Sequence, residues 1–163
     1  MLADMSVRCT SFCRWAVISR HCGNYHEGNR FMSSPNTEEI MLDDRANRKR
    51  LAGMVTNLFA CWDLSDGEAC MLLGKPSDDL GDLRRYRNGA PIAEDPELIQ
   101  RIGHLLAIHK ALRIIFPRNK ELAYRWASQP NSRFEGKRAL DIMTGSCEGL
   151  AEIRRSLETE LVR

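Results

Sequence analysis

Long hydrophobic runs and strand-like alternation are both missing from this sequence. A membrane-spanning helix needs about 18 consecutive apolar residues, and no run among the 163 residues approaches that length. Nor do apolar and polar residues alternate with a period of two, which is the pattern of a half-buried strand. The sequence therefore predicts a soluble, all-α protein. Six scattered cysteines with no clear signal peptide ahead of them favour free thiols and a cytoplasmic location.

Residue patterns typical of active sites are also absent. The sequence has no Cys-x-x-Cys pair, no His-Glu-x-x-His motif, no phosphate-binding glycine loop and no Ser/His/Asp order of a hydrolase. His109 follows Leu105 by four residues on an apolar stripe, a position that favours a core or interface histidine over a catalytic base. We therefore expect no enzymatic activity, no cofactor and no metal.

Residues 1–44 show no sustained helical period, and Gly, Asn, Ser and Pro cluster between Gly23 and Asn36. This composition is typical of a flexible extension. The extension carries five thiol and imidazole side chains, which are zinc-ligand types: Cys9, Cys13, His21, Cys22 and His26. Their spacing fits no common zinc pattern. Incidental ligand types are the favoured interpretation, and an enzyme acting through this segment is the alternative.

From Arg45 onward, apolar residues recur with the period of a helix. One stripe predicts a first helix that ends near Asp63, and Ser65 with Glu68 forms a capping-box pattern that opens a second, ended by Gly74. Ser77 is predicted to cap a third helix that runs to about Arg87. A long helix follows, capped by Asp95 and joining two domains.

The last part of the chain predicts three short helices. The first runs from Lys120 to about Ala127 with Asn119 as its cap, the second covers 136–144, and Ser146 caps the third. The expected organisation is an extension over 1–44, a helix-turn-helix domain with its long helix over 45–116, and a small helical domain over 117–163. Two short helices joined by a glycine-containing turn, after a longer helix, are the outline of a helix-turn-helix.

Two groups of residues resemble a known family over about residues 46–161. The run Leu64-Ser65-x-x-Glu68-Ala69, with Leu72-Leu73-Gly74 and Leu83-x-Arg85-Tyr86-Arg87-x-Gly89, resembles an Xre-type helix-turn-helix. The second group resembles the C-terminal toxin-binding domain of the Xre/MbcA/ParS antitoxin family: Phe116-Pro117-Arg118-Asn119, Ala123-Tyr124-Arg125-Trp126, Gln129-Pro130-Asn131, Phe134 to Asp141, Gly145 and Glu148-Gly149-Leu150.

The resemblance implies an antitoxin that blocks a cognate toxin, commonly a RES-domain enzyme that consumes NAD, and that represses its own operon, with a homodimer expected. A stand-alone transcriptional regulator is the alternative. The implied toxin-binding residues are Trp126, Pro130, Asn131, Phe134, Gly136, Lys137, Leu140, Glu160, Leu161, Val162 and Arg163.

The third predicted helix is the DNA reader of a helix-turn-helix. Its expected DNA-binding residues are Lys75, Ser77, Arg84, Arg85, Arg87 and Asn88. Asp78, Asp79 and Asp82 fall in the same stretch and repel phosphates, and the formal net charge of the chain is only +2. A monomer should therefore hold DNA weakly at physiological salt.

Overall fold

The computed structural model describes residues 45–162, and the predictions made for residues 1–44 lie outside that range. The all-α prediction is confirmed: the described chain holds seven α-helices and two short 3₁₀ helices, and no strand. No helix between residues 45 and 162 has the length and apolar character needed to cross a membrane. All described residues belong to one compact unit.

The first three helices are α2 (Arg45–Cys61), α3 (Asp66–Leu72) and α4 (Gly81–Arg87). The predicted capping box opens α3, because the Ser65 hydroxyl accepts a hydrogen bond from the Glu68 amide at 3.3 Å and the Glu68 carboxylate accepts from the Ser65 amide at 3.0 Å. Gly74 has a φ of 78°, a left-handed conformation that suits the turn after a helix.

The predicted start of the third helix at Ser77 is wrong, because α4 begins at Gly81. The aspartates between them accept hydrogen bonds that form turns and not a helix. The Leu80 amide donates to the Asp78 carbonyl at 3.0 Å, and the Gly81 amide donates to the Asp79 carboxylate at 3.3 Å. Aspartate side chains and turns compete in this way with helical bonds. The connection between α3 and α4 therefore covers 73–80, longer than the roughly 3–4 residues of a helix-turn-helix turn.

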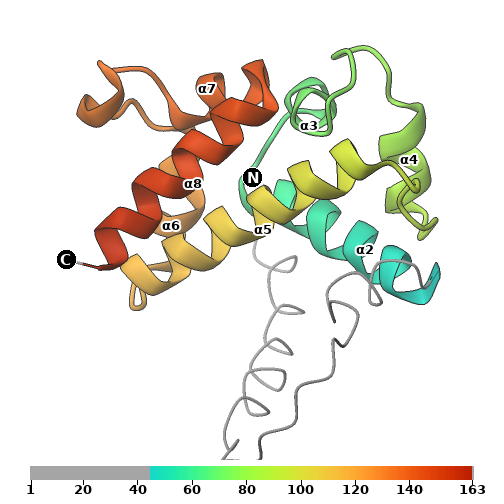
Figure 1. The fold of residues 1–163 in the computed structure, drawn as a ribbon, viewed down its shortest axis with the longest axis horizontal. Helices are drawn as coiled ribbons and strands as arrows, with labels where there is room; N and C mark the ends of the chain where they lie inside the picture. The colour runs from blue at the N-terminus through green and yellow to red at the C-terminus, as the bar shows by residue number, and fades with distance from the viewer. Residues whose placement is uncertain (1–44, 163) are drawn as a thin grey trace, which may run out of the picture. The chain divides into compact units, whose positions relative to one another are not determined.

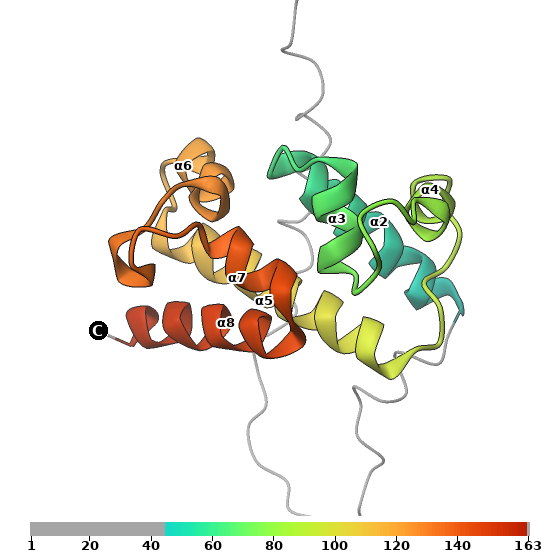
Figure 2. The same cartoon turned by 90° about the horizontal axis from the view of Figure 1, so that it is seen from above.

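Helix α5 (Pro96–Ile115) is the longest of the described helices and packs against α2, α6 and α8 (Figures 1 and 2). The predicted cap is present, since the Asp95 carboxylate accepts from the Glu97 amide at 3.0 Å. One continuous core surrounds this helix, and its largest fully buried side chains include Phe59, Trp62, Leu105, Leu112, Leu140 and Met143.

The rest of the described chain comprises α6 (Lys120–Arg125), the 3₁₀ helices η2 (Trp126–Ser128) and η3 (Ser132–Phe134), α7 (Ala139–Gly145) and α8 (Cys147–Leu161). The predicted caps Asn119 and Ser146 are confirmed, accepting from the Leu122 amide at 2.9 Å and the Gly149 amide at 3.0 Å. The predicted helix start at Gly136 is wrong. Glu135 and Gly136 have φ values of 56° and 79°, which no right-handed helix allows, so α7 begins only at Ala139.

Candidate functional site

The segment between η2 and α7 is a loop closed by its own backbone. The Asn131 amide donates to the Lys137 carbonyl at 3.1 Å, and the Gly136 amide donates back to the Asn131 carbonyl at 3.0 Å. Just outside this pair, Pro130 and Arg138 form an isolated antiparallel bridge. The Asn131 side chain accepts from the Arg133 amide at 3.0 Å. These bonds give residues 131–137, here called the 131–137 loop, a defined shape.

A left-handed pair sits at the tip of the 131–137 loop. Gly136 adopts its φ of 79° without steric cost, but Glu135 at 56° has a side chain that disfavours this conformation. The Glu135 side chain is exposed. Backbone strain of this kind clusters at functional sites, where the surrounding structure enforces it.

Aromatic packing holds the 131–137 loop against η2. Phe134 meets Trp126 edge to face, with ring centroids 6.2 Å apart and an interplanar angle of 86°. Phe134 is 9% exposed and Leu140 is 1% exposed, so a partner could reach neither without displacing other side chains. Among the sequence-predicted residues of this region, Pro130, Gly136 and Lys137 are exposed, and Asn131 and Trp126 are half-buried.

Arg133 joins the loop to the end of α8. Its Nη1 donates to the Ser156 hydroxyl at 3.3 Å and to a Glu160 carboxylate oxygen at 2.9 Å. The loop and the last turns of α8 therefore form one surface, here called the loop–α8 face, made of residues 131–137, Ser156 and Glu160. Sequence reasoning named residues on both sides of this surface and missed Arg133 itself.

The chain end beyond this face is apolar and exposed. Leu161 is 40% exposed and Val162 is 90% exposed. Glu160 is also exposed, and Arg163 lies outside the described residues. The predicted terminal residues from 160 to 162 are thus all accessible to a partner.

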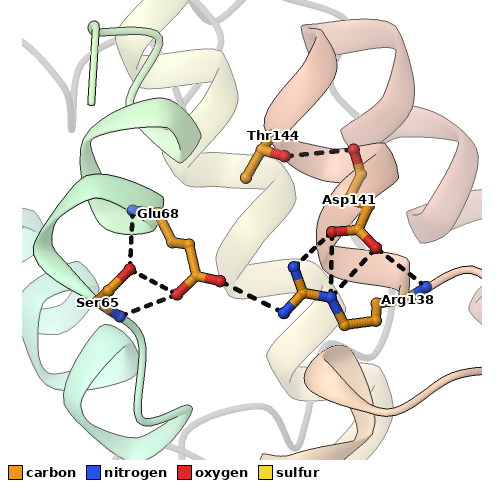
Figure 3. A network of polar contacts seen from close by, with 5 residues as sticks. All are labelled: Ser65, Glu68, Arg138, Asp141 and Thr144. Carbon is orange, nitrogen blue, oxygen red and sulfur yellow. Dashed lines mark hydrogen bonds and ion pairs between the residues drawn. The ribbon is translucent and has the colours of Figure 1, made fainter.

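A polar network ties α7 to α3 beside the loop (Figure 3). The Arg138 guanidinium pairs with Asp141 at 2.6 Å and reaches the Glu68 carboxylate at 3.5 Å. Bonds from Ser65 and the charge of Arg138 hold the pKa of Glu68 below its ordinary value, and the bond from Arg138 does the same for the pKa of Asp141. Arg138 therefore contributes to the N-terminal caps of both helices.

The predicted DNA-binding cations have close acidic neighbours. Arg85 and Lys75 lie 3.3 Å and 3.8 Å from the Asp82 carboxylate, and Arg87 pairs with Asp66 at 2.6 Å, which lowers the pKa of Asp66. Arg84 is exposed and makes no ion pair with any residue between 45 and 162. Ser77 and Asn88 are also exposed, Ser77 in the turn before α4 and Asn88 at its end.

His109 belongs to α5 and packs toward α6, as its place on the apolar stripe suggested. Its ring stacks on Tyr124 with centroids 5.8 Å apart, and burial lowers its pKa to about 4. A ring that is neutral at physiological pH suits packing. Within residues 45–162, no group of three or more His, Cys, Asp or Glu side chains is arranged to hold a metal ion.

Comparison with known proteins identifies the part of the chain that carries this surface. Residues 111–159 match the model of the antitoxin Xre/MbcA/ParS C-terminal toxin-binding domain. The chain is also similar to the uncharacterized protein y4oB of Sinorhizobium fredii, with 33% identity over 100 residues that cover 61% of this chain and 74% of y4oB. No solved structure gives a significant match.

Proposed function

We propose that this chain, which matches the Xre/MbcA/ParS C-terminal toxin-binding domain of antitoxins over residues 111–159, neutralises a cognate toxin by covering the toxin's catalytic cleft with the loop–α8 face and the end of α8. The observation that carries this proposal is the overlap of the family match with that surface, although the match ends just before Glu160. Residues 111–159 include the whole 131–137 loop and most of α8.

The exposed end of α8 supports the same surface. Apolar side chains such as Leu161 and Val162, left open to water, contribute to binding when a partner covers them. Glu160, which directly precedes them, is bonded to Arg133 of the 131–137 loop. A surface with an apolar end and a charged, preformed loop is suited to docking on another folded protein.

Truncation tests this proposal. Deleting residues 158–163 removes only exposed side chains among those described and keeps the buried Leu157. We expect the truncated chain to lose neutralisation when it is co-expressed with the product of the neighbouring gene, while its helical circular dichroism changes little. Rescue of growth by the truncated chain would refute occlusion by this end.

The resemblance to the family favours a RES-domain toxin that degrades NAD. Cellular NAD measured after induction of the neighbouring gene, with and without this chain, tests the assignment. NAD that falls with the toxin alone and recovers on co-expression supports it. Unchanged NAD in poisoned cells assigns the toxin to another class and leaves the antitoxin role standing.

A second function, operator binding through α4, is favoured by Arg84. This cation is exposed and forms no ion pair within the described chain, so its charge is available to phosphates or to guanine. The pairing of Arg85 and Arg87 with aspartates reduces the attraction of the rest of the helix. We therefore expect binding only by a homodimer or a toxin-bound assembly that presents two copies of α4.

A gel shift on the chain's own promoter tests this function. Replacing both Arg84 and Arg85 by Ala should abolish the shift, because it removes two cations of α4 that would contact phosphates or base edges. The matched control replaces Arg154 and Arg155 of α8, which keeps the net charge change equal. Equal binding by the Arg84/Arg85 variant and its parent would rule out α4 as the reader. DNA binding without any toxin partner would favour a stand-alone regulator.

A further inference from the structure

We propose that Arg133 is a positioning residue, which holds the 131–137 loop against the last turns of α8 so that loop and helix meet the toxin as one preformed face. The inference rests on the proposed function, since it concerns the surface that the toxin would contact. Arg133 is not among the residues that the family resemblance suggested.

The loop behaves as a unit because its backbone bonds are internal. The Phe134 amide donates to the Asn131 carbonyl at 3.0 Å and the Lys137 amide to the Phe134 carbonyl at 2.9 Å, in addition to the two bonds between Asn131 and the 136–137 end. A loop closed in this way can move relative to α8 by turning as a whole or by opening these bonds. Both movements are limited by the contacts that the loop makes with the rest of the chain.

Two contacts hold the loop toward η2 and α7, and Arg133 holds it to α8. Phe134 packs on Trp126 of η2, and Arg138, just after the loop, pairs with Asp141 of α7. Among the hydrogen bonds and ion pairs described within residues 45–162, only those of Arg133 connect the loop to α8. Without them, no polar contact of the described chain would fix the distance between the loop tip and the end of α8.

The geometry suits an arginine. Ser156 and Glu160 are four residues apart and lie on one side of α8, one turn above the other. A single Nη1 bonds to both, at 3.3 Å and 2.9 Å. Arg133 and Glu160 are each 42% exposed, and exposed pairs of this kind contribute little to folding. The effect of the contact should therefore appear in binding, where a preformed surface loses less entropy on association.

The first experiment measures binding to the product of the neighbouring gene, with the toxin inactivated by mutation. Arg133→Ala should bind about three- to tenfold more weakly than the parent, with an unchanged circular dichroism spectrum. Arg154→Ala is the matched control, because it removes an equally exposed pair with Glu158 on the same helix and should bind within about twofold of the parent. Arg133→Lys keeps one bond to Glu160 and should recover part of the loss.

A cycle of variants separates positioning from direct contact. If Arg133 acts through α8, then Ser156→Ala with Glu160→Ala should weaken binding, and adding Arg133→Ala to that pair should cause no further loss. If the fold-losses in affinity multiply in the triple variant, Arg133 contacts the toxin independently of α8. That result would overturn the positioning role.

A measurement on the free chain tests the same idea without the toxin. Amide hydrogen exchange at residues 134, 136 and 137 should be faster in Arg133→Ala than in the parent, because the loop is released from α8. Unchanged exchange would overturn the proposal. If the parent fails to bind the toxin, the proposed function and this inference fail together. If the parent binds and Arg133→Ala binds equally well, only the positioning role fails.

Discussion

Gly149 allows α8 to lie against α7, and replacing it with Ala should destabilise the protein although Ala is the better helix former. Gly149 is fully covered near the start of α8. A Cβ placed on it would overlap the carbonyl oxygen of Ile142 and lie 3.0 Å from the carbonyl carbon. Both are backbone atoms of α7, so no side-chain rotation can relieve the overlap.

Two opposing effects set the size of the change in stability. Exchanging Gly for Ala in a helix gains at most about 1 kcal/mol in helix propensity, and less near the first turn. Separating α7 and α8 enough to admit a methyl group is an overpacking change that costs about 1–3 kcal/mol. It also disturbs Leu150 and Ile153, which are fully buried in the same core. Because the cost of the clash exceeds the gain in helix propensity, we expect a net loss of about 1–2 kcal/mol.

Gly103 provides the matched control. It lies in the middle of α5, is exposed, has no positive φ, and has no atom within 4 Å of the position where a Cβ would be. Gly103→Ala should therefore stabilise by about 0.5–1 kcal/mol. Urea unfolding followed by circular dichroism compares the two variants with the parent. A Gly149→Ala variant as stable as the parent would refute the close approach of α7 and α8.

Four further substitutions test three other features. Burial lowers the folded pKa of His109 to about 4, so stability is complete above its ordinary value of 6.5 and declines as pH falls toward 4. His109→Gln should flatten that decline by about 1–2 kcal/mol after screening of the half-exposed ring, and an unchanged pH profile in urea titrations would contradict it. Arg138→Ala should lower the free energy of unfolding by about 1 kcal/mol or less in thermal unfolding. The double variant with Glu68→Gln should be less destabilised than the sum of the two single variants. Additive losses of stability would mean that the network does not couple α3 and α7. Glu135→Gly should raise unfolding free energy by roughly 0.5–1 kcal/mol through relief of its positive φ, and a loss would show that the Glu side chain supports the fold.

Local signals predicted most of the helices. Ser65, Asp95, Asn119 and Ser146 all cap the helices that the sequence assigned to them, because a cap depends on residues within one turn. The start of α4 was mispredicted because Ser77 has the chemistry of a cap, yet the aspartates that follow it bond into turns. Such competition between two local bonding patterns is decided by packing that a linear pattern does not contain.

The candidate site was predictable in its parts and not in its assembly. The resemblance pointed to the 131–137 loop and to the end of α8 as separate stretches. Their connection runs through Arg133 and Glu160, which are 27 residues apart in the chain. Spacing carries no information about a contact across a loop and a helix. The burial of Phe134 and Leu140 is likewise a property of the assembled core, where these side chains support the surface from beneath.

Helix α5 limits how independently the two predicted domains can act. The buried residues of α8 include Leu150, Ile153 and Leu157, and α8 packs against α5. A domain beginning at residue 117 would leave that stripe without α5, and an uncovered apolar stripe is unfavourable in water. The family match accordingly begins at 111, inside α5. Because α5 also packs against α2, the loop–α8 face and the helices that precede α5 rest on one shared core.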